Sequence, residues 1–246
     1  MSEIKTGNIE AIRDWSKRYF YTKNEVNEMF ISRDSLSLIN SRWRSGSSNV
    51  LTENARYIYS GNVDGIYAMI IPNNSSNAVI TNPLLASGNH FKLSVRFKFT
   101  DISTNSWRTL IANIGHINHL PSISYNAYSK LFNCDYSSNG SSWDKTLTIS
   151  FPNLTANEWY RIDYEWDGQK IYGIIFDSDD NVLVSKEKEV SNNWYYDSAA
   201  YYVLGGMNNN STYYSRNTVI DIANTYWTVN GDIVWGTDLY EHEGRI

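Results

Sequence analysis

The chain has 246 residues, 41% of them hydrophobic and 19% charged, which is typical of a folded domain and argues against intrinsic disorder. A net charge of −5 does not favour nucleic acid as a partner, because phosphate binding needs clustered basic residues. No apolar run is long enough to cross a membrane, and the N-terminus has no signal-peptide pattern. The single cysteine, Cys134, cannot form an intrachain disulfide, so we expect folding in a reducing cytoplasm.

The first forty-odd residues have a helical pattern. Ile12 and Trp15 fall near helical spacing, and Thr22–Glu25 forms a capping box, in which an N-cap hydroxyl precedes a glutamate by three residues. The short helix that this box starts would carry an apolar stripe. Such a stripe is covered either by the main domain or by copies of itself in a parallel bundle. Ser45–Ser48 then has the composition of a flexible joint.

From about Asn54 the hydrophobic pattern changes to period two, with turns rich in Asn, Gly, Ser and Asp at short intervals. This rhythm predicts a mainly β fold, an antiparallel jelly-roll sandwich over residues 47–246. The helical segment over residues 1–46 is then a neck for oligomerisation or attachment. The predicted strands are Ala55–Tyr59, Tyr67–Ile71, Phe91–Phe99, Thr109–Ile114, Ser122–Tyr128, Lys130–Tyr136, Thr146–Phe151, Trp159–Trp166, Lys170–Phe176, Val182–Lys186, Tyr201–Leu204, Thr218–Ile222, Tyr226–Val229 and Ile233–Trp235.

The clearest structural signal is Asn157–Val184. Charged or polar residues alternate with aromatic and aliphatic ones along Trp159–Trp166, which indicates a strand with one buried face. Asp167-Gly168 predicts a tight hairpin turn, in which both central residues need positive φ. Asp177–Asn181 offers the next turn. A second tight hairpin is predicted at Asn230-Gly231 by the same argument.

Several strand patterns resemble those of concanavalin A-like jelly rolls of the laminin-G type. They are Phe91–Phe99 (FKLSVRFKF), Thr109–Gly115 (TLIANIG), Glu158–Gly168 (EWYRIDYEWDG), Tyr202–Met207 (YVLGGM) and Val219–Trp235, which follow in the order expected of that family. The resemblance covers roughly Asn54 to Gly236. It implies a two-sheet sandwich of a kind that more often binds a ligand than performs a reaction.

Two short segments resemble appendage proteins of bacteriophages. Tyr19–Phe30 (YFYTKNEVNEMF) is similar to an element that precedes a trimeric neck or a receptor-binding head in tail fibres. Val219–Trp235, which ends TVNGDIVW, is similar to the last strands of phage laminin-G-like domains. The resemblance implies a phage or prophage virion protein, made in the bacterial cytoplasm. Its head would recognise a bacterial surface glycan.

Jelly rolls of this class include retaining β-glucanases, so the carboxylates of the long hairpin need attention. Retaining hydrolysis requires two carboxyl groups ~5–5.5 Å apart. Arg161 stands where the nucleophilic carboxylate would be, and an arginine can be neither nucleophile nor acid. Arg161, Asp163 and Glu165 share a strand face, where their charges can pair. We therefore assign no catalytic residue and expect a protein that is not an enzyme.

Metal sites are not expected either. Asp177, Asp179 and Asn181 resemble the start of a calcium loop, but the EF-hand glycine and glutamate are replaced by Val182 and Lys188. A plain acidic turn is the preferred interpretation, with Ca²⁺ as the alternative. No zinc site is predicted from the histidines, because zinc needs three or four convergent ligands. The four histidines are His90, His116, His119 and His242.

The candidate ligand contacts are aromatic residues in polar loops, because a sugar needs a flat apolar surface flanked by hydrogen-bonding groups. The alternative is that these rings pack under the loops or against neighbouring subunits. We give most weight to the first three of the candidates, which are Trp194, Tyr195, Tyr196, Trp107, Trp143, Tyr213 and Tyr214.

Three functions follow in order of preference. The first is a homotrimeric tail fibre whose lectin-like head binds a glycan, with the N-terminal segment joining other virion proteins and trimerisation raising avidity. The second is a structural fibre or capsid decoration protein that binds no ligand. The third is an enzyme that degrades polysaccharide.

Overall fold

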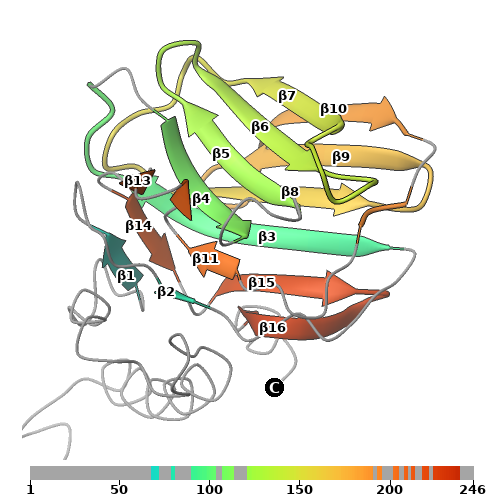
Figure 1. Ribbon diagram of the computed structural model, residues 1–246. Helices are drawn as coiled ribbons and strands as arrows, with labels where there is room; N and C mark the ends of the chain where they lie inside the picture. The colour runs from blue at the N-terminus through green and yellow to red at the C-terminus, as the bar shows by residue number, and fades with distance from the viewer. Residues whose placement is uncertain are drawn as a thin grey trace, which may run out of the picture. The chain divides into compact units, whose positions relative to one another are not determined.

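The computed structural model describes residues 68–71, 79–80, 90–103, 107–113, 121–190, 193–195, 202–204, 208–209, 212–213, 218–221 and 224–238. The predicted N-terminal helix and the predicted strand Ala55–Tyr59 lie outside these residues. Within them the chain is all-β, with two antiparallel sheets that face one another (Figure 1). This arrangement confirms the predicted antiparallel jelly-roll sandwich.

The larger sheet has eight strands in the order β1-β14-β3-β8-β9-β10, with β15 paired to β3 and β16 paired to β15. All of its described pairings are antiparallel. The strands are β1 (Ala68–Ile71), β3 (Phe91–Phe99), β8 (Tyr160–Trp166), β9 (Lys170–Phe176), β10 (Val182–Glu189), β14 (Thr218–Asp221), β15 (Asn224–Val229) and β16 (Asp232–Asp238).

The smaller sheet has six strands in the order β2-β11-β4-β5-β6-β7, also antiparallel. Its strands are β2 (Val79–Ile80), β4 (Trp107–Asn113), β5 (Ser122–Asn126), β6 (Leu131–Tyr136), β7 (Lys145–Ser150) and β11 (Tyr202–Leu204). A separate two-stranded ribbon joins β12 (Asn208–Asn209) to β13 (Thr212–Tyr213). The sequence patterns did not predict β2, β12 or β13, because two residues are too few to show a period.

Aromatic side chains on the two inner faces form the core between the sheets. Phe91, Phe97 and Phe99 of β3 lie across from Tyr136, Phe132 and Tyr125, at ring-centroid distances of 6.1, 5.7 and 5.6 Å respectively. Such pairs add about 0.5–1.5 kcal/mol each beyond the burial of their area. The alternation predicted for β8 is observed, since Tyr160, Ile162, Tyr164 and Trp166 are buried on this inner side.

The two predicted glycine hairpins differ in their turns. Asn230-Gly231 forms the expected two-residue turn, with φ of 51° and 90°, between Val229 and Asp232. The hairpin predicted at Asp167-Gly168 is present, but its turn lies one residue later: the N–H of Asp167 donates to the carbonyl oxygen of Lys170 at 3.1 Å, and Gly168, not Asp167, has positive φ. The Asp167 carboxylate explains the difference. Its Oδ1 accepts the backbone N–H groups of Gln169 and Lys170 at 2.8 and 2.7 Å.

Two lysines of β10, the last strand of the larger sheet, bond to β7, the last strand of the smaller sheet. Lys186 and Lys188 donate from their Nζ atoms to the carbonyl oxygens of Thr148 and Thr146, at 2.6 and 3.0 Å. Both lysines lie opposite inner-facing positions of β9, since Lys186 pairs with Gly173 and Lys188 with Ile171. Inward-pointing charges on an edge strand oppose pairing with another chain.

Candidate functional site

Trp194, the aromatic residue given most weight, belongs to the core. Its side chain is only 5% exposed. Its ring centroid lies 5.8 Å from that of Phe91 and 5.8 Å from that of Trp227. The prediction that this ring offers a flat face to a sugar is therefore wrong in this structure. The tryptophan instead fixes the segment that carries the next residue.

Tyr195 is 36% exposed and lies against the loop that joins β6 to β7. Its backbone N–H donates to the carbonyl oxygen of Ser137 at 2.7 Å. Its ring covers Gly140, where a Cβ would meet the ring carbons Cε1 and Cζ at 2.9 Å. The fold thus brings together two of the aromatic segments predicted from the sequence, the one around Trp143 and the one around Trp194 and Tyr195.

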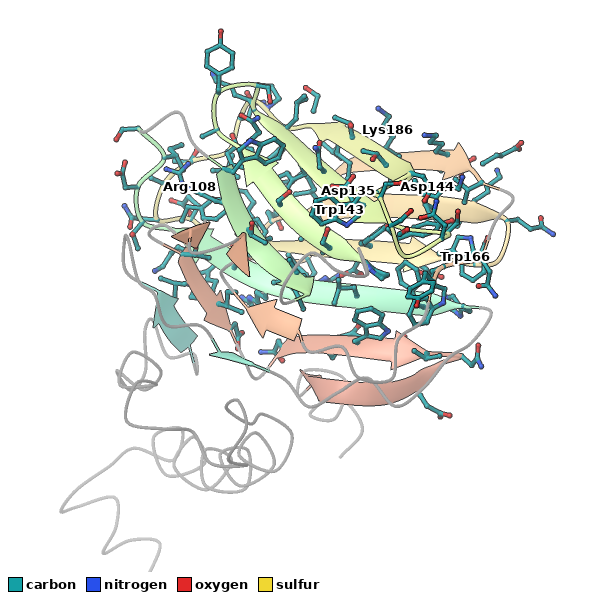
Figure 2. All side chains as sticks on the ribbon, in the orientation of Figure 1. Arg108, Asp135, Trp143, Asp144, Trp166 and Lys186 are labelled. Atoms are coloured by element: carbon teal, nitrogen blue, oxygen red, sulfur yellow. The ribbon has the colours of Figure 1, made fainter. Side chains whose placement is uncertain are left out.

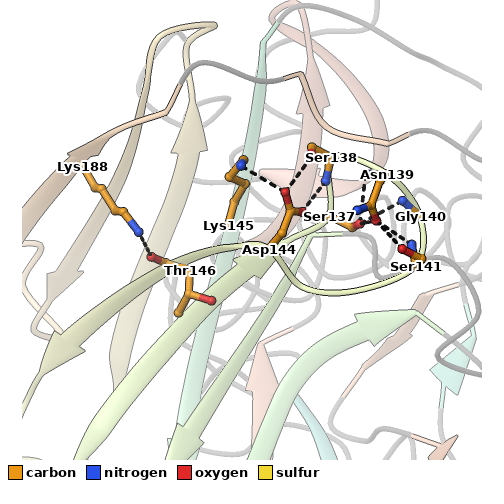
Figure 3. Close-up of polar contacts among 9 residues, drawn as sticks. All are labelled: Ser137, Ser138, Asn139, Gly140, Ser141, Asp144, Lys145, Thr146 and Lys188. Atoms are coloured by element: carbon orange, nitrogen blue, oxygen red, sulfur yellow. Dashed lines mark hydrogen bonds and ion pairs between the residues drawn. The ribbon is translucent and has the colours of Figure 1, made fainter.

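The β6–β7 loop is held by its own polar groups (Figure 3). Ser137 Oγ accepts the N–H of Gly140 at 2.8 Å, and Asn139 Oδ1 accepts both the N–H and the hydroxyl of Ser141, at 2.8 and 2.7 Å. Asp144 accepts the N–H and the hydroxyl of Ser138 at 2.7 and 2.6 Å. The loop conformation is therefore specified locally rather than by a ligand.

Asp144 carries the charge of this loop. Partial burial acts to raise its pKa, but the hydrogen bonds from Ser138 and the ammonium group of Lys145 at 3.0 Å outweigh burial and lower the pKa to about 2. The carboxylate is ionised at neutral pH and its oxygens are engaged within the loop. It therefore serves to hold the loop.

We call Ser137–Asp144 together with Tyr195 the tip cluster. Asn139, Ser141 and Ser142, which neighbour Gly140 in the chain, are exposed, and Trp143 is half-buried. An aromatic face with amide and hydroxyl groups around it is the combination that binds a sugar ring. Figure 2 shows Trp143 and Asp144 at the same end of the β6–β7 hairpin as Asp135.

Trp107 lies at the other end of the smaller sheet. It is the first residue of β4 rather than a loop residue, and it is 38% exposed. It pairs with Asn126, which pairs with Leu131 at the start of β6, whereas the tip cluster follows the end of β6 at Tyr136. The separation along β6 is ~17 Å at ~3.3 Å per residue. Trp107 is therefore not part of the tip cluster.

The remaining aromatic candidates are placed only in part. Tyr213 lies in β13, opposite Asn208. Tyr196 and Tyr214 lie outside the described residues. An exposed ring that the sequence reasoning missed is Tyr128, which is 77% exposed in the turn after β5. The alternating pattern predicts Tyr128 as the last residue of a strand, whereas Asn126 accepts the N–H of Tyr128 at 3.0 Å and β5 ends at Asn126.

The carboxylates on the outer face of β8 are paired. Arg161 Nε lies 3.2 Å from Asp163 Oδ1, and its guanidinium carbon lies 3.9 Å from the ring centroid of Phe176. Asp163 also accepts the hydroxyl of Ser94 at 2.7 Å. Glu165 Oε1 lies 2.8 Å from His90 Nε2, a partner 75 residues away that strand periodicity could not identify. The predicted pairing of Arg161 and Asp163 along the strand is observed.

The acidic turn after β9 is closed by its own side chain. Asp177 Oδ1 accepts the backbone N–H groups of Asp179 and Asn181, both at 2.9 Å, and Oδ2 accepts the Asn181 amide at 3.0 Å. These bonds lower the pKa of Asp177, with those from Asn181 contributing most. No group of three or more possible metal ligands occurs among the described residues, which do not include His116, His119 or His242.

Cys134 is the one thiol of the chain and it lies on the inner face of β6, fully buried. Burial, together with the nearby Asp135 charge, raises the pKa of this thiol well above its ordinary value. A protonated, buried thiol is a poor nucleophile.

In the described part of the chain, no helix is long and apolar enough to cross a membrane.

No protein-family model and no curated protein sequence matches this chain. Among solved structures, an alginate lyase superposes with a TM-score of 0.50 at 9% identity, over 79% of this chain and 97% of that one. A botulinum neurotoxin type C structure gives a TM-score of 0.49 at 10% identity, over 84% of this chain and 51% of that one. Mouse laminin α1 domains LG4-5 give 0.44 at 16% identity, over 70% and 44%.

The likeness to the alginate lyase supports the fold, a sandwich of two antiparallel sheets. At identities of 9–16% the likeness concerns the fold alone. The chain spans about half the length of the first two solved structures that it matches.

Proposed function

We propose that the described domain is a lectin-like binding domain and that its tip cluster contacts a glycan. The observation that carries this proposal is the position of Tyr195. Its exposed ring is held against Gly140 and beside exposed Asn139 and Ser141. Because the loop is fixed by its own hydrogen bonds, little ordering entropy would be lost on binding. The one carboxylate of the tip cluster, Asp144, is already bonded to Ser138 and Lys145.

The setting that we propose is a bacteriophage virion. Tyr19–Phe30 and Val219–Trp235 support it by their resemblance to phage appendage proteins. In this proposal residues 1–46 form the neck that trimerises the chain and joins it to other virion proteins, and residues 47–246 form the head. Three heads on one fibre would convert a weak contact with a bacterial surface glycan into useful avidity.

A glycan array tests the binding proposal. Wild type and Tyr195→Ala are compared with Tyr128→Ala, which removes an equally large exposed tyrosine from the other end of the sandwich. We expect specific binding that Tyr195→Ala loses and Tyr128→Ala keeps.

Light scattering on the full chain and on a chain without residues 1–46 tests the trimer. A full-length monomer would refute the trimeric fibre.

A structural fibre or decoration protein is the second candidate. It is favoured by the fact that the polar groups of the β6–β7 loop already bond to one another, as a loop without a ligand would require. A blank array with an intact trimer would support it.

The enzyme is the third candidate, and it would require release of reducing ends from a host polysaccharide that Glu165→Gln abolishes.

A further inference from the structure

The two sheets differ in the chemistry of their outer faces. On the larger sheet, charged residues of β3 and β8 form ion pairs, such as Lys92 with Asp163 at 3.1 Å and Arg161 with Asp163 at 3.2 Å. On the smaller sheet, the consecutive strands β5, β6 and β7 carry hydroxyl and amide groups instead. Strand alternation assigns this face, because Phe132, Cys134 and Tyr136 of β6 are buried in the core.

Strand register aligns these polar groups in rows across the smaller sheet. One row is Ser122, Asp135 and Thr146, and the next is Ser124, Asn133 and Thr148. We call these six residues the hydroxyl face. Ser124, Asn133, Thr146 and Thr148 are half-buried, a degree of exposure that leaves their polar groups within reach of a ligand. Neighbouring rows and strands lie ~5–7 Å apart, so the donors and acceptors form a regular grid.

Asp135 is the single ionisable residue of the hydroxyl face. It is 9% exposed, and among the described residues no cation forms a salt bridge with it. Burial raises its pKa to about 6, although a hydrogen bond with Thr146 acts in the opposite direction. Lys186 and Lys188 donate to the main-chain carbonyls of Thr148 and Thr146 on β7. An anionic ligand on this face would therefore meet a carboxylate that has no salt-bridge partner in the described part of the chain.

The hydroxyl face connects the two exposed aromatic sites. Its Asp135 row is next to the tip cluster, which begins one residue after Tyr136. At the opposite end, Trp107 on β4 pairs with Asn126 on β5, and Asn126 pairs with Leu131 on β6. Figure 2 shows this separation, with Asp135 and Trp143 at one end and Arg108, the neighbour of Trp107, at the other. Aromatic rings at both ends of a polar surface suit an extended chain of sugar rings.

We propose that the hydroxyl face is the main contact surface for an uncharged oligosaccharide, which runs from the tip cluster toward Trp107. This inference rests on the proposed glycan binding and specifies where the ligand lies and which class it belongs to. Hydroxyl and amide side chains match the hydroxyls of a neutral sugar. An acidic sugar would meet the Asp135 carboxylate, which forms no salt bridge among the described residues, and like charges brought together in a partly buried site are costly.

The test is an array that holds neutral and acidic glycans in equal number, probed with four forms of the full chain. Asn133→Ala removes a half-buried amide from the centre of the hydroxyl face. Ser185→Ala is the matched control, because Ser185 pairs with Ile174 on the outer face of the larger sheet. Tyr195→Ala tests the tip cluster and wild type is the reference. Thermal melting confirms that each variant is folded.

We expect wild type to bind neutral glycans, with affinity lowered about tenfold by Asn133→Ala, because one good hydrogen bond contributes up to ~1.5 kcal/mol. Ser185→Ala should leave the affinity unchanged. If Tyr195→Ala abolished binding and Asn133→Ala left it intact, the hydroxyl face would not be the main contact surface. The proposed lectin function would stand. If wild type bound only acidic glycans, the proposal that the ligand is uncharged would be refuted, and the proposed lectin function would stand. A blank array would overturn the lectin function itself.

Discussion

The ring of Tyr195 lies on Gly140 so closely that a single added methyl group would collide with it. An added Cβ would lie 2.9 Å from two ring carbons, and the φ of Gly140 is +76°, a conformation that L side chains rarely adopt. The contact joins a residue of the β6–β7 loop to one that follows β10, 55 positions later in the chain. It defines the tip cluster.

Gly140→Ala should therefore displace the Tyr195 ring and weaken glycan binding. Gly231→Ala is the matched control, because Gly231 also has positive φ, +90°, but has no atom within 4 Å of the added Cβ. Each variant should lose about 1 kcal/mol of unfolding free energy through its backbone. Only Gly140→Ala should lower binding on the array. Equal binding by both variants would show that the ring position does not matter.

Trp194→Ala and Tyr195→Ala should have very unequal effects on stability, although the residues are adjacent. Trp194 fills the core against Phe91 and Trp227, so its truncation should cost about 3–5 kcal/mol of unfolding free energy. Tyr195→Ala should cost less than about 1 kcal/mol, because the side chain is partly exposed. Urea denaturation measures both. Comparable losses would mean that the ring of Tyr195 is a structural element rather than a free surface.

Gly173→Ala should be strongly destabilising through a clash between the two sheets. An added Cβ would lie 2.3 Å from Ile149 Cδ1 and 3.0 Å from Leu147 Cδ2. Overpacking of this kind costs about 1–3 kcal/mol. Ile149→Val removes the Cδ1 atom, so the double variant should recover part of the loss in a double-mutant cycle. Purely additive losses would contradict the clash.

Asp135 should make the domain less stable as pH rises. Burial raises its folded-state pKa to about 6, above its ordinary value of 3.8, so the unfolded chain releases its proton first. Unfolding free energy should be unaffected by Asp135 below about pH 4, should fall between about pH 4 and 6, and should level off above that. The total effect is on the order of 3 kcal/mol. Asp135→Asn should remove the fall in a pH series of urea melts.

A pH series with Asp144→Asn is the complement. The folded-state pKa of Asp144 is lowered to about 2, so its contribution is present above about pH 4 and is lost as pH falls toward 2. Asp144 is partly exposed, so solvent screening keeps the effect small. If Asp135→Asn and Asp144→Asn moved the melts in the same direction at pH 5, the assignment of the two carboxyls would be wrong.

Much of the fold could be predicted from local patterns. The bounds of β3 and β9 agree with the predicted strands, and the Asn230-Gly231 turn has the expected geometry. The errors occurred where a side chain competes with the backbone. Asp167 captures two N–H groups and changes the hairpin turn, and Asn126 ends β5 two residues early.

The sequence by itself determined the all-β class, most of the strands and the pairing of charges along β8, because alternation and turn residues act over a few positions. Only the tertiary structure decided which aromatic residues are exposed. Trp194 and Tyr195 are adjacent and equally aromatic, yet one is held in the core and the other lies on Gly140. The difference depends on contacts with Phe91, Trp227 and the β6–β7 loop, and no local pattern records contacts between residues so far apart in the chain.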